Sequence, residues 1–119
     1  MEVLEFTLML GTNQPEKMAQ FYGKILGLPR IEKFSGPVFR AHGGNIRILN
    51  HSEIKGKNIE QARFQINLFV ANALAEFKRL KTQQVPIIRN PQEEGWGGIV
   101  ATLEDPDGNY IQLLEEPAS

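Results

Sequence analysis

Polar side chains recur at alternate positions of strand-like segments, where they could bind a small molecule or a metal ion. Arg47 lies in "GNIRIL", Gln65 and Asn67 lie in "RFQINLFV", and Gln112 lies in "GNYIQLL". A guanidinium group binds carboxylates and phosphates, and a carboxamide both donates and accepts hydrogen bonds. The same residue types also suit an ordinary solvent-exposed sheet face, so their number alone does not decide between the two interpretations.

Other residues that often carry chemistry form no convincing group. The chain has no cysteine, and its two histidines, His42 and His51, have no partner at ligand spacing, which favours turn or surface positions. Asp105 and Asp107 of "DPDG" resemble a fragment of a calcium loop, but the later acidic ligands are missing. We therefore predict that this stretch is a hairpin turn, and no catalytic triad is indicated.

The composition limits the classes of partner. The chain has 119 residues with 41% hydrophobic content, which suffices for one domain with a core. Its 13 basic and 14 acidic residues give a net charge of -1, so we expect neither nucleic-acid nor membrane binding. No segment approaches the roughly 20 apolar residues that span a bilayer. The absence of cysteine suits a reducing compartment, and we expect a cytoplasmic protein.

The elements of the first half are predicted from periodicity. Residues 3–10 alternate as in a half-buried strand, and residues 13–27 carry an apolar stripe at helical spacing, with Pro15 near the start and Gly27 as the stop. Extended segments follow near 29–34, 37–42 and 45–50. The polar stretch 51–62 has neither periodicity and is predicted to be a linker.

The second half repeats this pattern at a period of about 60 residues. Residues 63–70 alternate like the first strand, and residues 72–84 form a predicted helix with Asn72 as its N-cap. Extended segments are expected near 86–89, 98–104 and 109–115. We predict one domain, 1–119, made of two βαβββ modules, about 1–50 and 63–116, joined by the linker 51–62.

Each helix can cover only one sheet face, so the other face of each sheet is either solvated or encloses a ligand. Strand parity places both polar and apolar residues on that helix-free face. Trp96, in the glycine-rich stretch "EEGWGGIV", is either a hydrophobic plug or a wall that stacks on a ligand. The candidate ligand-binding residues are Thr7, Arg47, Arg63, Gln65, Asn67, Phe69, Trp96, Tyr110 and Gln112.

The tandem βαβββ units, "FYGKILGL" at 21–28 and "DPDGNYIQLLE" at 105–115 resemble the vicinal oxygen chelate superfamily. This superfamily includes glyoxalase I, extradiol dioxygenases and bleomycin resistance proteins. The resemblance covers essentially the whole chain. It implies an α+β fold in which the two modules form a curled, cup-like mixed sheet with the helices outside, and it implies a homodimer.

The enzymes of this superfamily hold a divalent metal ion in the cup. The resemblance places the four ligand positions at Thr7, Arg47, Gln65 and Gln112, which include no histidine and no carboxylate. Hard or borderline dications prefer anionic oxygen or imidazole, and a guanidinium repels a cation. We therefore expect no metal cofactor.

Three functions remain open. The first is a metal-free protein of this superfamily that binds a small organic molecule in the cup, as bleomycin resistance proteins do. The second is a metal-dependent lyase, isomerase or dioxygenase with an atypical ligand set. The third is a non-catalytic module that binds another protein. The sequence does not decide whether any reaction is catalysed.

Overall fold

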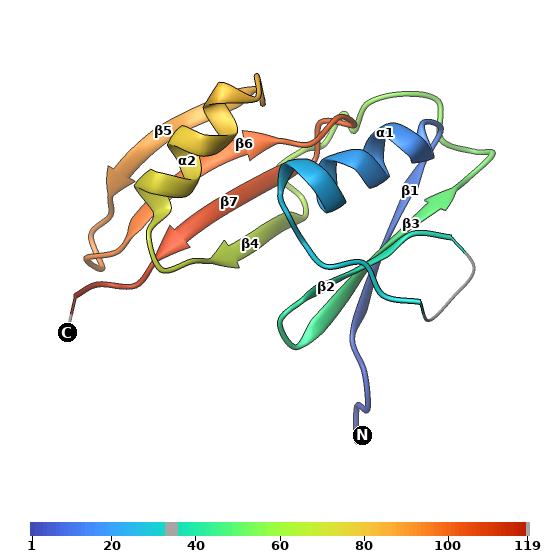
Figure 1. Cartoon of the computed structure of the whole chain (residues 1–119), viewed down its shortest axis with the longest axis horizontal. Helices are drawn as coiled ribbons and strands as arrows, with labels where there is room; N and C mark the ends of the chain where they lie inside the picture. The colour runs from blue at the N-terminus through green and yellow to red at the C-terminus, as the bar shows by residue number, and fades with distance from the viewer. Residues whose placement is uncertain (33–35, 119) are drawn as a thin grey trace. The chain divides into compact units, whose positions relative to one another are not determined.

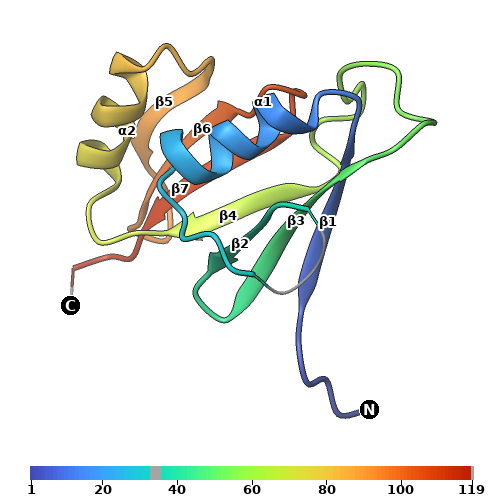
Figure 2. The ribbon, with the colours of Figure 1, turned by 45° about the vertical axis from the view of Figure 1, so that its right-hand side comes forward.

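Two α+β units, Met1–Gly56 and Lys57–Ser119, make up the chain in the computed structural model, which describes residues 1–32 and 36–118. Each unit contains a mixed sheet and its own helix, as Figures 1 and 2 show, so the predicted α+β class is confirmed. Both sheets keep open edges. In the part of the chain that the structure describes, no helix is long and apolar enough to cross a membrane.

The first unit has a three-stranded sheet in the order β1-β3-β2. β3 runs parallel to β1 and antiparallel to β2, and the β2–β3 hairpin turns at His42, whose φ is 54°. His42 is thus a turn residue, as predicted. The elements are β1 (Thr7–Thr12), α1 (Pro15–Gln20), the π-helical turn η1 (Phe21–Ile25), β2 (Val38–Ala41) and β3 (Gly44–Asn50).

The first helix begins and ends where the sequence predicts. Pro15 occupies the first turn of α1, where its missing N–H leaves no hydrogen bond unmade. The helix widens into η1 and ends at Gly27, whose φ of 82° lets Leu28 N–H donate to Tyr22 O at 3.0 Å. η1 packs on β2, since a Cβ at Gly23 would lie 2.8 Å from the Phe39 ring. The helix therefore covers one face of the first sheet.

The predicted extended segment near 29–34 is wrong where the structure describes it. Within 29–32, Arg30 forms a single isolated bridge with Phe39, and Ile31 N–H donates to Val38 O at 2.9 Å. Residues 33 and 34 lie outside the described part of the chain. Proline and glutamate are depleted in strands, and within 29–32 the segment pairs with β2 through this bridge and the hydrogen bonds beside it.

The second unit has a four-stranded sheet in the order β4-β7-β6-β5. β4 and β7 run parallel, the other neighbours run antiparallel, and β5 carries two register shifts against β6. The elements are β4 (Gln65–Phe69), α2 (Ala73–Thr82), β5 (Ile87–Glu93), β6 (Ile99–Glu104) and β7 (Tyr110–Glu115).

α2 packs on one face of this sheet (Figure 1). The Asn72 side chain accepts from Ala75 N–H at 3.0 Å, so the predicted N-cap is confirmed. The Glu115 carboxylate of β7 accepts from Ala73 N–H at 2.8 Å, which ties the helix start to the sheet. The buried stripe is Ala73, Phe77 and Leu80, whereas Leu74 is half-exposed.

The β6–β7 turn is held by several side-chain hydrogen bonds. The Asp105 carboxylate is buried and accepts from Asp107 N–H, Asn109 N–H and Asn109 Nδ2, each at 2.9 Å. Gly108, with φ of 80°, closes the turn. "DPDG" is therefore a hairpin turn, as predicted.

The end of the predicted linker packs on this turn. Asn58 N–H donates to Asp107 O at 2.8 Å, Asn58 Nδ2 donates to Asn109 Oδ1 at 3.1 Å, and Gln61 Nε2 donates to Gly108 O at 2.8 Å. Residues 57–62 therefore belong to the second unit. The boundary between the units falls inside the stretch that the sequence predicts to join two modules.

Candidate functional site

The helix-free face of the second sheet carries a row of polar side chains across all four strands. Asn67 of β4 pairs with Gln112 of β7, Gln112 pairs with Thr102 of β6, and Thr102 pairs with Arg89 of β5. Paired residues of neighbouring strands share a face. Gln112 lies in the middle of this row, on the face predicted for it from strand parity.

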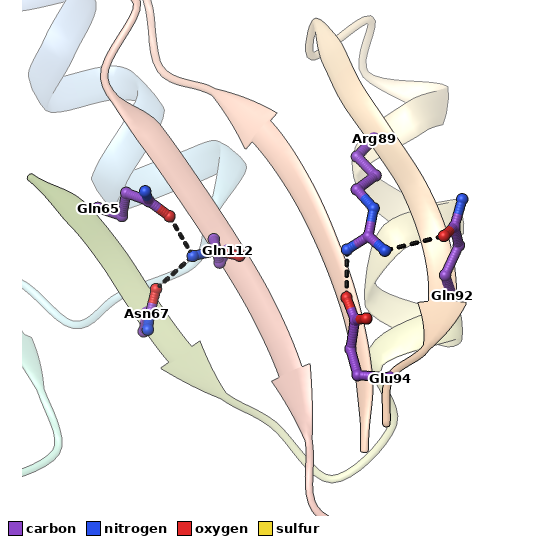
Figure 3. A network of polar contacts seen from close by, with 6 residues as sticks. All are labelled: Gln65, Asn67, Arg89, Gln92, Glu94 and Gln112. Atoms are coloured by element: carbon purple, nitrogen blue, oxygen red, sulfur yellow. Dashed lines mark hydrogen bonds and ion pairs between the residues drawn. The ribbon is translucent and has the colours of Figure 1, made fainter. Parts of the chain in front are cut away.

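Three carboxamides at one end of the row are joined by hydrogen bonds, and we name Gln65, Asn67 and Gln112 the amide cluster. Gln112 Nε2 donates to Gln65 Oε1 and, at 3.0 Å, to Asn67 Oδ1 (Figure 3). Gln65 Nε2 in turn donates to the backbone carbonyl of Ala62 at 3.1 Å. The three residues predicted to share a face therefore also contact one another.

A second polar group lies on the same face at the far edge of the sheet. Arg89 donates to Glu94 and, through Nη2 at 2.8 Å, to Gln92 Oε1 (Figure 3). The hydrogen bond from Arg89 lowers the pKa of the Glu94 carboxyl from its ordinary value, and the same hydrogen bond raises the pKa of Arg89. This arginine is therefore already paired with a carboxylate.

Apolar side chains flank the amide cluster. Phe69 of β4 pairs with Leu114 of β7, and each lies two residues after Asn67 or Gln112 on the helix-free face. The side chain of Phe69 is exposed, with 58% of the residue open to solvent. Tyr110 is half-buried and pairs with Gln65, at the opposite end of the amide cluster from Phe69. Phe69 also lines an open groove of about 440 Å³ with Val70, Ala71, Glu115, Glu116, Pro117 and Ala118. Exposed polar and apolar side chains therefore lie together on this face.

Trp96 lies at the tip of the β5–β6 hairpin and is 50% exposed. Its indole lies against Gly98, because a Cβ at that glycine would come within 2.0 Å of two ring atoms. The tip is closed by the hydrogen bond from Glu94 N–H to Gly98 O at 2.8 Å. The outer edge of the six-membered ring therefore lies against Gly98, and half of the side chain remains open to solvent.

In the first unit, the helix-free face carries Thr7, Asn45 and Arg47. Thr7 pairs with Asn45 in the register of β1 with β3, and Arg47 follows two positions on. Thr7 Oγ1 donates to Glu5 Oε2 at 3.1 Å. Asn45 is 5% exposed, and its Oδ1 has no hydrogen-bond partner in the part of the chain that the structure describes. A buried carbonyl oxygen needs a hydrogen-bond donor, which a water molecule or a ligand can supply.

Arg63, the remaining candidate, lies outside the sheet. β4 begins at Gln65, two residues later, and the Arg63 guanidinium pairs with Glu60, with Nη2 2.9 Å from Oε2. This is an exposed ion pair of neighbours in sequence, which contributes little to stability.

The residues at the four positions where the resemblance implies metal ligands do not fit a dication. The oxygen of Gln65 accepts from the Gln112 nitrogen instead of facing an open site, and Arg47 brings a positive charge. Over residues 1–32 and 36–118, no three His, Cys, Asp or Glu side chains form a group that could hold an ion. The donor set is that of a hydrogen-bonding surface.

Sequence reasoning missed Thr102 and Arg89 on this face. The parity of 98–104 would have placed Thr102 beside Gln112, since that strand pairs regularly with β7. No such signal existed for Arg89, because the two register shifts in β5 break the period of two on which parity depends.

The comparisons with known proteins agree on one family. The sequence model of the Glyoxalase/Bleomycin resistance protein/Dioxygenase superfamily matches residues 6–113. None of the curated proteins matches the sequence significantly.

Several solved structures are similar to the whole chain. A glyoxalase/bleomycin resistance protein/dioxygenase from Nocardioides has a TM-score of 0.75 at 14% identity, covering 100% of this chain and 87% of that one. TioX from Micromonospora sp. ML1 has a TM-score of 0.75 at 13% identity, covering 96% and 99%. Lactoylglutathione lyase from Agrobacterium tumefaciens has a TM-score of 0.72 at 13% identity, covering 96% and 94%. At these identities the likeness is one of fold.

Proposed function

Because the chain belongs to the glyoxalase/bleomycin resistance protein/dioxygenase superfamily, we propose that it binds a small organic molecule on its helix-free sheet faces without a metal ion. The observation that carries this proposal is the amide cluster. Two of the four positions where the resemblance implies metal ligands are held by Gln65 and Gln112, which bond to each other. Carboxamides arranged in this way recognise neutral or polar organic groups far better than they coordinate a dication.

Features of each unit, taken separately, support the same proposal. Phe69 and Tyr110 provide apolar area on either side of the polar centre, and small-molecule sites combine such area with a few placed polar groups. In the first unit, the buried Asn45 Oδ1 needs a hydrogen-bond donor, which a ligand can supply. Arg47, on the same face as Asn45, suits an anionic group of a ligand.

A ligand screen by thermal unfolding tests the proposal. A ligand at about 100 times its Kd stabilises the folded protein by about 2.7 kcal/mol, which raises the melting temperature measurably. We expect at least one small molecule to do so in the presence of EDTA, and Gln112→Ala to abolish the effect. Gln92→Ala is the control, because Gln92 lies on the same sheet face beyond the amide cluster.

Two results would contradict the proposal. A stoichiometric divalent ion that purified, untagged protein retains through dialysis would favour a metal-dependent lyase, isomerase or dioxygenase. A screen in which no small molecule raises the melting temperature would favour a module that binds another protein.

We also propose that the protein is a cytoplasmic homodimer. The absence of cysteine suits a reducing compartment. Val3, Leu4 and Phe6 precede β1 as a run of exposed apolar side chains, with Leu4 88% exposed, and such patches mark interfaces. Light scattering should show a dimer that Leu4→Asp dissociates. Ile59→Asp, at a similarly exposed apolar residue of the second unit, should leave the dimer intact.

A further inference from the structure

The orientation of the amide cluster is fixed by one backbone atom. The carbonyl oxygen of Ala62 can only accept a hydrogen bond, so the Gln65 amide must turn its nitrogen toward it, and this bond is 3.1 Å long. The opposite orientation would place two oxygen atoms against each other. Gln65 Oε1 is therefore directed away from Ala62, toward β7.

The orientation of Gln65 determines the orientation of the other two amides of the amide cluster. Gln65 Oε1 needs a donor, so Gln112 presents Nε2, and the second hydrogen of that nitrogen goes to Asn67 Oδ1 (Figure 3). Both hydrogens of the Gln112 amide are then used. Each amide can flip only if its neighbours flip as well, and the Ala62 carbonyl opposes a flip of Gln65.

Over residues 1–32 and 36–118, two polar atoms of the amide cluster have no hydrogen-bond partner, Gln112 Oε1 as an acceptor and Asn67 Nδ2 as a donor. Gln65 Nε2 keeps one hydrogen beside its bond to Ala62. A ligand group that satisfies both Gln112 Oε1 and Asn67 Nδ2 must carry a donor as well as an acceptor. A carboxylate has no hydrogen-bond donor, and its negative charge would be repelled by the partial negative charge of Gln112 Oε1.

The charges on the same sheet face do not change this preference. Arg89 lies two strands from Gln112, beyond Thr102, and its guanidinium is bound to Glu94 and Gln92. A carboxylate at the amide cluster would therefore lose water without gaining a free cation of this sheet.

We infer that the amide cluster recognises a neutral group with both an N–H donor and a carbonyl acceptor, such as a carboxamide, a lactam or a urea, and discriminates against a carboxylate. This inference rests on the proposed function and names the chemistry of the ligand group that contacts the second unit. Gln65 acts as a positioning residue, since it orients Gln112 and both of its side-chain polar atoms are already hydrogen-bonded within the protein.

The test compares benzamide with benzoate, which differ only in the group concerned. Side-chain NH₂ signals of Gln65, Asn67 and Gln112 are followed by ¹H–¹⁵N NMR in the full-length protein during titration. We expect benzamide to shift the Asn67 and Gln112 signals and to bind about tenfold more tightly than benzoate, the effect of roughly one hydrogen bond plus an avoided repulsion.

Two variants and a control separate recognition from general disturbance. Asn67→Asp keeps the oxygen that Gln112 needs and removes the outward donor, so benzamide should bind about five- to tenfold more weakly. Gln65→Leu removes the anchor, so the preference for benzamide over benzoate should fall toward one. Gln92→Glu makes the same amide-to-acid change on the same face outside the amide cluster, and it should leave benzamide binding unchanged.

The outcomes distinguish this inference from the proposed function. Benzoate that binds as tightly as benzamide at these signals would overturn the inference and leave the proposed function standing. If Gln65→Leu keeps the preference for benzamide over benzoate, then the Ala62 carbonyl does not determine the orientation of Gln112 and Asn67. If neither probe shifts the three signals at millimolar concentration, the inference fails, and the broad ligand screen then decides on the proposed function.

Discussion

Replacing Asp105 by alanine should destabilise the second unit by about 3–5 kcal/mol. The carboxylate is 1% exposed and accepts three hydrogen bonds, two of them from the backbone N–H groups of Asp107 and Asn109. A hydrogen bond to a charged group contributes about 1.5–3 kcal/mol, and a buried donor left unsatisfied costs about 1–3 kcal/mol. The three bonds share one turn, so their contributions overlap and the total falls below their sum.

Asp105→Asn is the sharper variant, because it changes one atom. Its remaining oxygen can still accept from both backbone N–H groups, but its new nitrogen faces Asn109 Nδ2, donor against donor. Asn109 cannot simply turn its amide, since its Oδ1 accepts from Asn58 Nδ2. We expect a loss of about 1–2 kcal/mol, intermediate between wild type and alanine.

The assay is urea unfolding at neutral pH, with hydrogen exchange of the Asp107 and Asn109 amides as a local measure. Glu116→Ala removes the same charge from an exposed position and should change stability by less than about 0.5 kcal/mol. A loss below about 1 kcal/mol in Asp105→Ala, or equal losses in the alanine and asparagine variants, would contradict this prediction. Either result would mean that the turn does not depend on its carboxylate.

Further predictions concern the β5–β6 hairpin. Gly98→Ala should displace the indole of Trp96, because the new Cβ would lie 2.0 Å from two ring atoms and 2.7 Å from the Glu115 carbonyl oxygen. We expect a shifted fluorescence maximum of this single tryptophan and a loss of about 1–3 kcal/mol, whereas Gly95→Ala, with no atom within 4 Å of its Cβ, should change neither. Arg89→Leu should raise the pKa of Glu94 toward its ordinary value, as NMR titration of the carboxyl would measure. Since the folded-state pKa of Glu94 lies below its unfolded value, the pair stabilises the protein above the unfolded pKa, and that contribution is lost as pH falls through the folded pKa. An unchanged Glu94 titration in the variant would exclude Arg89 as the cause.

Much of the fold follows from local sequence signals. Strand parity placed Gln65, Asn67 and Gln112 on one face, and the register of β4 with β7 confirms it. Pro15, Gly27 and Asn72 marked helix ends correctly because each acts through its own backbone or its nearest neighbours. The repeat predicted two similar halves, and the structure has two units of helix and mixed sheet.

Other features depend on contacts that are distant in sequence. The segment 29–32 lies between turn signals where a strand is predicted, but it finds only one bridging partner, Phe39. Arg89 escaped notice because bulges in β5 shift its parity. The orientation of the amides could not be predicted either, since it originates at the carbonyl oxygen of Ala62, which every residue type would provide.

The central claim is that the helix-free face of the second unit binds a small organic molecule without a metal ion. The most direct test is a fragment screen by ¹H–¹⁵N NMR in EDTA, read at the side-chain amides of Gln65, Asn67 and Gln112. We expect at least one fragment to shift these signals and an added divalent ion to leave its binding no stronger. Two results would contradict metal-free binding at this face: the signals move only after a divalent ion is added, or no fragment moves them.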